Sequence, residues 1–195
     1  MNIVELNILT QRFLKKNQLN SIEIIFNYLH QPMSTRKYKG VIVGAGAIAS
    51  GYDHPGSIEI ATHAHALSAH PKTELAGFFD IDLPKAEAAA KKWGTKFFSS
   101  LEAMFEAVRP DIVVVAVPDE HHALVLESIV RYHPKIVIAE KPLTTSIHDT
   151  RRVLNLYADA GIPIAVNYRR RFDPSVQRVQ DMSSRGKCGA VVCAS

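Results

Sequence analysis

A turn rich in small residues, Gly44-Ala45-Gly46-Ala47-Ile48-Ala49, is the first segment whose residue types and spacing could do chemistry. It follows the aliphatic run Val41–Val43 and fits the pattern G-x-G-x-x-A. The first glycine of such a turn permits a tight bend out of a strand, and the second lets the backbone approach a pyrophosphate. Backbone N–H groups at the start of the following helix then hold the phosphates. The segment therefore predicts a dinucleotide-binding turn.

An acidic residue, Asp80, ends the next strand-like run, Glu74–Phe79. A carboxylate at this place can accept hydrogen bonds from the adenosine ribose of a bound dinucleotide. Asp80 lies farther from the turn than the roughly 20 residues expected, so residues 51–63 are predicted to form an insertion before the rest of the first helix. A carboxylate repels a 2′-phosphate and Ile81 adds no positive charge, which favours NAD over NADP. The alternative is an ordinary turn of small residues followed by a solvated aspartate.

Polar residues also follow three further strand-like runs. Glu140 and Lys141 come directly after Ile136–Ala139, the segment 115–122 (VAVPDEHH) ends the preceding strand, and Asn167 opens the segment after the following one. Ligands of open parallel sheets bind beyond the carboxyl ends of the strands. These three strand ends are therefore expected to direct polar side chains into one crevice.

Strand-like and helix-like segments alternate through the middle of the chain. Nearly continuous β-branched or aromatic runs predict buried strands at Gly40–Val43, Glu74–Phe79, Ile112–Val117, Ile136–Ala139 and Ile162–Val166. Helices are predicted for Pro84–Gly94, from Ser100, from His121 and from Ser146 to Gly161, because capping serines, an early proline and terminal glycines mark their ends. The alternation predicts an α/β fold with a Rossmann-type, doubly wound parallel sheet.

Two of these helices have apolar residues at helical spacing. In the helix from His121 the expected inner side carries Leu124, Ile129 and Tyr132. In the helix from Ser146 the expected inner side carries Val153, Leu156, Tyr157 and Ala160.

Composition and charge limit the class of protein. The chain has 195 residues, of which 47% are hydrophobic and 22% charged. No window reaches the roughly 18 apolar residues of a membrane span, and two cysteines make no disulfide framework, so a reducing, cytoplasmic setting is expected. The formal charge of +4 is concentrated after Tyr168. An arginine triplet without interleaved aromatic residues is a weak signal for nucleic acid, which is not expected as a partner.

The nine histidines raise the question of a metal site. His63 and His65 are two residues apart, so on a helix they do not share a face, and no acid completes a set of ligands at metal spacing. No metal site is predicted. These histidines are expected on a loop and helix near the crevice, where one of them could touch a substrate.

Three segments are predicted along the chain. Residues 1–37 read as an extension, and Met33 is a plausible alternative start. Residues 38–167 form the predicted dinucleotide-binding domain. Residues 168–195 contain a helix over 173–184 and the start of a strand in CGAVVCAS, which is interpreted as the beginning of a truncated second domain.

Taken in order, GAGAIA, Asp80, AVP with the histidine pair, AEKPLT and NYRRRFDP resemble the Gfo/Idh/MocA oxidoreductases, the family of glucose–fructose oxidoreductase and inositol dehydrogenase. The resemblance covers about residues 39–195. It implies NAD as cofactor, a sugar, cyclitol or sugar derivative as substrate, and a homo-oligomer for a full-length form. The residues that it assigns to the cofactor are Gly44, Ala45, Gly46, Ala47, Ile48, Asp80, Val117, Pro118, His122, Glu140, Lys141 and Asn167.

The resemblance also implies a catalytic role for Lys141, which together with Arg171 would border the substrate. A lysine ammonium beside the reacting oxygen stabilises developing negative charge and lowers the pKa of a hydroxyl group. In the family the base that takes the proton comes from the second domain, so it is expected beyond residue 195. The alternative function is a non-catalytic dinucleotide-binding regulator or an inactive fragment of such an enzyme.

Overall fold

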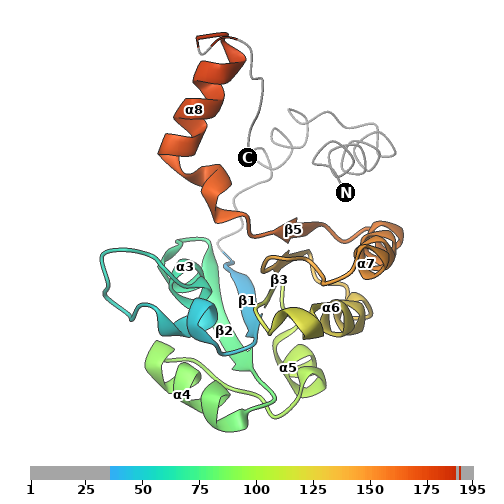
Figure 1. Cartoon of the computed structure of the whole chain (residues 1–195). Helices are drawn as coiled ribbons and strands as arrows, with labels where there is room; N and C mark the ends of the chain where they lie inside the picture. Colours follow the sequence, from blue (N-terminus) through green and yellow to red (C-terminus); the bar gives the residue numbers. More distant parts are fainter. Residues whose placement is uncertain (1–35, 188, 190–195) are drawn as a thin grey trace.

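A five-stranded parallel sheet forms the centre of the computed structural model, which describes residues 36–187 and 189 (Figure 1). The strands lie in the order β2-β1-β3-β4-β5. Their bounds are Tyr38–Val43 for β1, Thr73–Phe79 for β2, Ile112–Val115 for β3, Ile136–Ala139 for β4 and Ile164–Val166 for β5. All five predicted strands are present, although β3 ends two residues earlier and β5 begins two residues later than expected. Residues 1–35 of the predicted extension, including Met33, and the predicted terminal strand apart from Gly189 lie outside the described residues, as do both cysteines.

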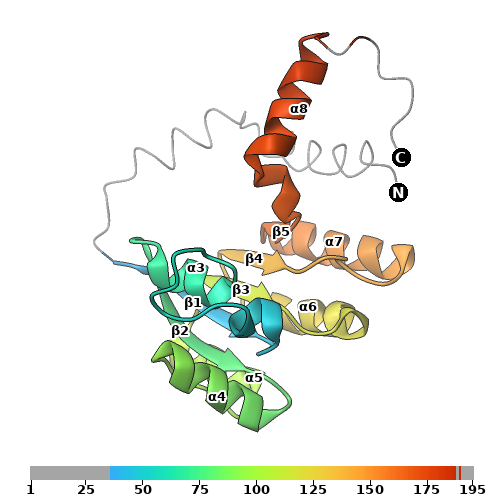
Figure 2. The same cartoon turned by 60° about the vertical axis from the view of Figure 1, so that its left-hand side comes forward.

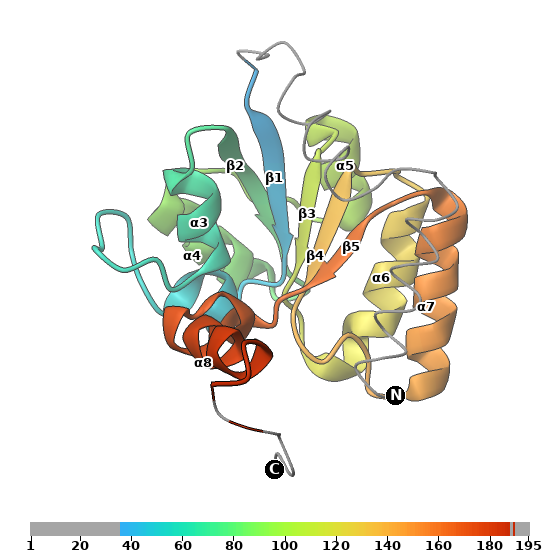
Figure 3. The same ribbon diagram turned by 90° about the horizontal axis from the view of Figure 1, so that it is seen from above.

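Helices cover both faces of this sheet (Figure 3). Successive residues of a strand point to opposite faces, so Val41 and Val43 are buried in one layer of the core and Ile42 in the other. The first layer lies against α5 (Leu101–Val108), α6 (His122–Val130) and α7 (Ile147–Ala160). The second lies against α3 (His63–Ala69) and α4 (Leu83–Trp93). The predicted doubly wound Rossmann-type sheet is confirmed.

Local capping residues explain where these helices begin and end. The side chains of Ser100 and Ser146 accept hydrogen bonds from the first turns of α5 and α7, as expected of N-caps. Gly94 and Gly161 end α4 and α7 in the left-handed conformation. The remaining elements are η1 (Ala47–Gly51), η2 (Asp119–His121), η3 (Arg169–Phe172) and α8 (Pro174–Ser184).

The predicted inner sides of α6 and α7 were partly wrong. Leu124 is 68% exposed and Leu156 is 38% exposed. In α6 the buried side chains are His122, Leu126 and Ile129, which recur at helical spacing. The side of α6 that faces the sheet therefore includes His122 in its first turn. Apolar periodicity alone does not identify this side, because a histidine is part of it.

A single carboxylate, Asp111, ties several strands together at the amino edge of the sheet. It accepts a hydrogen bond from the backbone N–H of Lys39 at 3.0 Å and forms ion pairs with Lys135 at 3.0 Å and Arg36 at 3.2 Å. Burial alone would raise the pKa of Asp111, but these donors and positive charges outweigh it and hold the pKa below its usual range. The carboxylate thus stays ionised between the starts of β1 and β4.

The last helix, α8, projects from the sheet beyond β5 (Figures 1 and 2). Asp173 caps it and Pro174 occupies its first turn, as the sequence predicts for a helix over 173–184. None of its residues is buried. It contributes nothing to the two core layers described above.

Candidate functional site

The turn after β1 is shaped for a ligand that approaches its backbone. Gly44 has φ of +100°, and a Cβ there would lie 2.3 Å from the carbonyl oxygen of Ala116, so only glycine fits. At Gly46 a Cβ would meet no atom within 4 Å, which leaves open space beside the backbone. The chain then enters η1, a single π-helical turn. Within the described part of the chain, the N–H groups of Gly46, Ala47 and Ile48 have no acceptor.

Asp80 lies directly beside this turn because β1 and β2 are neighbours that end together. Its Oδ2 accepts a hydrogen bond from the N–H of Ala45 at 2.7 Å, and its Oδ1 accepts one from the N–H of Asp82 at 2.9 Å. The carboxylate is therefore held at the edge of the turn by two backbone donors. Ile81 beside it is 84% exposed.

A second cluster lies at the ends of β4 and β5. Glu140 follows β4, and its Oε1 lies 2.8 Å from Nε2 of His63 and accepts a 2.6 Å hydrogen bond from the side-chain amide of Asn167. Its Oε2 accepts one longer bond, of 3.3 Å, from the N–H of Lys141. Burial raises the pKa of Glu140, but the bonds from Asn167 and His63 outweigh it, so the pKa lies below its ordinary value and the group is ionised near neutral pH.

Lys141 is exposed, in contrast to the acid before it. Among the described residues its ammonium group has no hydrogen bond or ion pair. It begins the loop that leaves β4, next to Pro142. The ammonium group is therefore available at the carboxyl edge of the sheet.

His122, at the start of α6, is enclosed by the protein. Its side chain has no exposed surface, and its ring nitrogens lie 2.7 Å from the carbonyl oxygen of Pro142 and 3.0 Å from that of Val117. These contacts link the loop after β3 to the loop after β4, and a place for His122 along the cofactor stays a prediction. Val117 is partly buried and Pro118 is exposed at the end of β3.

Arg171, the predicted substrate residue, is not brought into this cluster. It lies in η3 with an exposed side chain, and the hydrogen bonds described for it involve only its backbone. Asn167, four residues earlier, does join the cluster. The segment after β5 thus contributes its first polar residue to the cluster around Glu140 and leaves its arginines at the surface.

The insertion between η1 and α3 is ordered by a group that the sequence analysis missed. The carboxylate of Asp53 accepts hydrogen bonds from the N–H groups of Ala61 at 2.7 Å and Thr62 at 3.2 Å, and from the Thr62 hydroxyl. It also contacts Nδ1 of His65 at 2.8 Å. Thr62 in turn caps α3 by accepting a bond from the N–H of His65. The base of the loop is thereby closed and the first turn of α3, with His63, is held in place.

The signal for this group was present but weak. A threonine three residues before His65 is a helix cap by type, and an aspartate lies before it in the loop. Nothing in the spacing indicates that Asp53 turns back to this cap, because the loop conformation decides the contact. The residue pair His63 and Glu140 was missed for the same reason.

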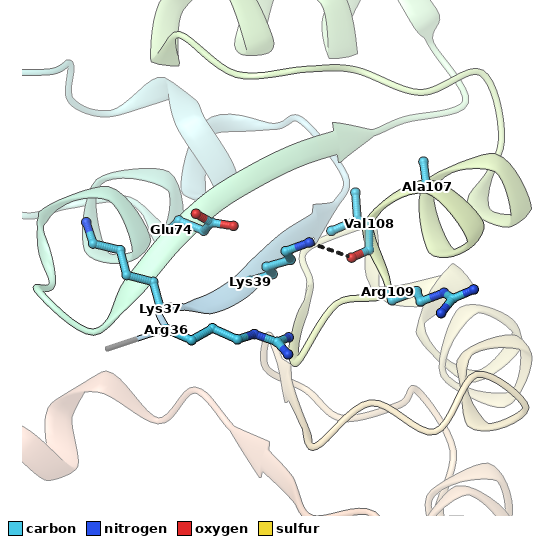
Figure 4. Close-up of a pocket in the computed structure, with 7 residues that line it drawn as sticks. All are labelled: Arg36, Lys37, Lys39, Glu74, Ala107, Val108 and Arg109. Carbon is cyan, nitrogen blue, oxygen red and sulfur yellow. Dashed lines mark hydrogen bonds between the residues drawn. The ribbon is translucent and has the colours of Figure 1, made fainter. Parts of the chain in front are cut away.

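A hollow of about 530 Å³ lies at the opposite edge of the sheet, near the start of β1 (Figure 4). It is lined mainly by basic and apolar residues, namely Arg36, Lys37, Lys39, Glu74, Ala107, Val108 and Arg109. Lys39 donates to the carbonyl oxygen of Val108 at 3.4 Å. Parallel sheets bind their ligands at the carboxyl edge, so this hollow is separate from the candidate site.

The described residues contain neither a cluster of metal ligands nor a helix that could span a membrane. Within 36–187 and 189, no group of three or more His, Cys, Asp or Glu side chains is arranged to hold a metal ion. Over the same residues, every helix is too short or too polar to cross a membrane.

Comparison with known proteins gives consistent matches. The model of an oxidoreductase family with an NAD-binding Rossmann fold, Gfo/Idh/MocA, matches residues 38–168. An inositol 2-dehydrogenase of Rubrobacter xylanophilus is 32% identical over 133 residues, which cover 66% of this chain and 38% of the relative. A dTDP-3,4-didehydro-2,6-dideoxy-alpha-D-glucose 3-reductase of Streptomyces violaceoruber is 33% identical, with 65% and 36% covered.

Solved structures agree with these sequence matches. An NAD-binding protein from Listeria innocua superposes with a TM-score of 0.66 at 30% identity, covering 79% of this chain and 42% of that protein. The WlbA dehydrogenase from Bordetella pertussis, solved with NADH and UDP-GlcNAcA, gives a TM-score of 0.67 at 26% identity, with 79% and 44% covered. The chain thus spans less than half the length of these relatives.

Proposed function

Since the chain belongs to the Gfo/Idh/MocA oxidoreductase family, we propose that it forms the NAD-binding part of an enzyme that moves a hydride between nicotinamide and a hydroxyl or carbonyl carbon. The substrate class is a sugar, a cyclitol or a sugar derivative. Relatives named as an inositol dehydrogenase and as a dTDP-sugar reductase support this class.

The residues of the turn fit the phosphate part of the cofactor. N–H groups of Gly46, Ala47 and Ile48 without acceptors, together with the open space at Gly46, suit a pyrophosphate. Asp80, fixed beside the turn by Ala45, would receive the adenosine ribose. A 2′-phosphate placed there would meet this carboxylate, and so the proposed cofactor is NAD in preference to NADP.

The other half of the dinucleotide is proposed to lie over the ends of β3, β4 and β5. In this proposal the adenosine lies at the end of β2 and the pyrophosphate at the end of β1. Because β3, β4 and β5 follow on the other side of β1, the nicotinamide half would extend toward Val117, Pro118, Glu140 and Asn167. A cofactor held there would supply the hydride chemistry, since NAD⁺ accepts a hydride and NADH donates one. Lys141, an exposed residue that directly follows Glu140 in the chain, would bind the reacting oxygen with its ammonium group and stabilise the negative charge that develops on it.

Segment boundaries and setting are part of the same proposal. Residues 38–167 would form the dinucleotide-binding domain, supported by the family match, and residues from 168 onward would begin a substrate and assembly domain that carries Arg171. A cytoplasmic setting and a homo-oligomer for a longer form follow from the family resemblance. Residues 1–37 would be an extension.

The observation that carries the proposal is the fixed pair of glycine turn and Asp80. The test is to titrate the purified chain with NADH and with NADPH and to monitor binding by the fluorescence of the reduced nicotinamide. We expect NADH to bind more tightly than NADPH, and Asp80→Asn to reduce this preference because the repulsive charge is removed. An unchanged preference in the variant would remove Asp80 from cofactor selection.

A non-catalytic regulator is the second candidate, and Lys141 separates the two. The protein is first assayed with NAD and a panel of inositols and nucleotide sugars. If one of them is oxidised, Lys141→Met should lower turnover by roughly 10²–10³-fold, while NADH binding stays within about twofold of the parent protein. If none of them is oxidised although NADH binds, the regulator becomes the better account.

A further inference from the structure

His63 is a half-buried polar residue of α3 whose side chain contacts a residue at the end of the central sheet. Its Nε2 lies 2.8 Å from Oε1 of Glu140, and each side chain is only 12% exposed. The two residues come from α3 and from the end of β4, 77 positions apart in the chain. An ionised carboxylate can only accept hydrogen bonds, so Nε2 of His63 carries a hydrogen atom and donates the hydrogen bond to Glu140.

The donors around Glu140 are distributed unequally between its two oxygens. Oε1 receives His63 and Asn167 at 2.8 and 2.6 Å, whereas Oε2 receives only the N–H of Lys141 at 3.3 Å. A carboxylate oxygen can accept two hydrogen bonds. The two short bonds therefore fix the orientation of the carboxylate and leave accepting capacity on Oε2.

The position of His63 is itself fixed by the insertion. Thr62, directly before His63, caps α3 and is hydrogen-bonded to Asp53. Ala64, directly after His63, is fully buried in the second core layer. The side chain of His63 is thus presented from a rigid first turn. A displacement of this turn would remove one of the two short bonds to Glu140.

On these contacts, and resting on the proposed function, we infer that His63 is a positioning residue for the nicotinamide end of the cofactor. Together with Asn167 it orients Glu140 so that Oε2 accepts a hydrogen bond from a donor group of the nicotinamide, such as its carboxamide. The adenosine and pyrophosphate parts, at β2 and β1, do not depend on His63. The insertion between η1 and α3 thereby acts on the opposite end of the dinucleotide from the turn that precedes it.

ADP-ribose provides the test, because it contains the adenosine, pyrophosphate and both riboses of NAD but lacks the nicotinamide. Binding of NADH and of ADP-ribose is measured by calorimetry for the parent chain, His63→Phe and His63→Gln. The phenylalanine keeps an aromatic ring without the donor, and the glutamine restores an amide donor. His70→Phe, at the exposed end of the same helix, is the matched control.

We expect His63→Phe to weaken NADH binding roughly tenfold, the size of one hydrogen bond to a charged group. ADP-ribose binding should stay within about twofold, His63→Gln should recover most of the NADH affinity, and His70→Phe should bind both ligands normally. Equal weakening of both ligands would show a structural role for α3 and would overturn the inference, as would unchanged NADH binding.

Two further outcomes separate this inference from the proposed function. If the parent chain binds neither ligand, the proposed function fails. If it binds ADP-ribose and NADH with equal affinity, the dinucleotide turn stands and the inference about His63 is overturned. Should His63→Phe not fold, Glu140→Gln replaces it: a donor amide in place of Oε2 should weaken NADH selectively, and equal effects on both ligands would contradict the inference.

Discussion

Replacement of Asp53 by asparagine tests whether a buried carboxylate holds the insertion together. Burial raises the pKa of Asp53, but the hydrogen bonds from Thr62, Ala61 and His65 outweigh it and lower the pKa to about 2, against 3.8 for an unperturbed aspartate. The lower pKa in the folded chain corresponds to about 2.4 kcal/mol of folding free energy near neutral pH, since one pKa unit equals about 1.36 kcal/mol. The loop lies at the surface, where solvent screens charges, so we expect about 1–2 kcal/mol.

The sign of the pH dependence follows from the direction of the shift. Because the pKa of Asp53 is lower in the folded chain, the stabilisation is complete above the unfolded value of 3.8 and is lost as pH falls toward about 2. The free energy of unfolding of Asp53→Asn should therefore lie about 1–2 kcal/mol below that of the parent at pH 7. This difference should shrink progressively between about pH 5 and pH 2.

Urea unfolding measures this difference, followed by circular dichroism and by tryptophan fluorescence. Trp93 is the only tryptophan of the chain, and its ring centre lies 5.6 Å from that of His65, so its emission reports on this group directly. Asp159→Asn, at an exposed position of α7, is the control and should change little. A difference between parent and Asp53→Asn that stays constant from pH 7 to pH 3 would refute the electrostatic reasoning.

Three further predictions concern the glycine turn and the contact between α6 and α7. Gly44→Ala should lower the melting temperature markedly, because its Cβ would meet a carbonyl oxygen and its φ is positive. Gly46→Ala should melt like the parent yet lose NADH binding, and normal binding by this variant would contradict the proposed pyrophosphate site. Tyr157→Phe removes the 2.9 Å bond from the buried hydroxyl to the carbonyl of Leu126. It should cost about 1 kcal/mol in urea unfolding, and an unchanged midpoint would mean that this bond adds no net stability.

The strands and helix ends could be predicted because local interactions decide them. Ser100, Ser146, Gly94 and Gly161 act within one helical turn of their own position, so residue type is enough. The turn at Gly44 and the acid at Asp80 could also be related, since the two strands that carry them are neighbours in any sheet of this class.

The cluster around Glu140 could be predicted only in part. Parallel strand ends meet at one edge, which brought Glu140 and Asn167 together in the expected place. The contribution of His63 depends on how the loop from Tyr52 to Thr62 folds back. That path is decided by Asp53, which bonds to Ala61 and Thr62 at the other end of the same loop. Periodicity and spacing contain no information of this kind, because they describe one element at a time.

The order of the strands also has a consequence for how the chain folds while it is being synthesised. β2 pairs with β1, β3 adds to the other side of β1, and β4 and β5 then extend the sheet outward in turn. Each strand after β1 therefore meets a partner that was synthesised before it, so only β1 has to wait for a strand made later. Among the described residues, β5 forms the last edge and has only three residues, and a short edge strand offers little surface for unwanted pairing with another chain.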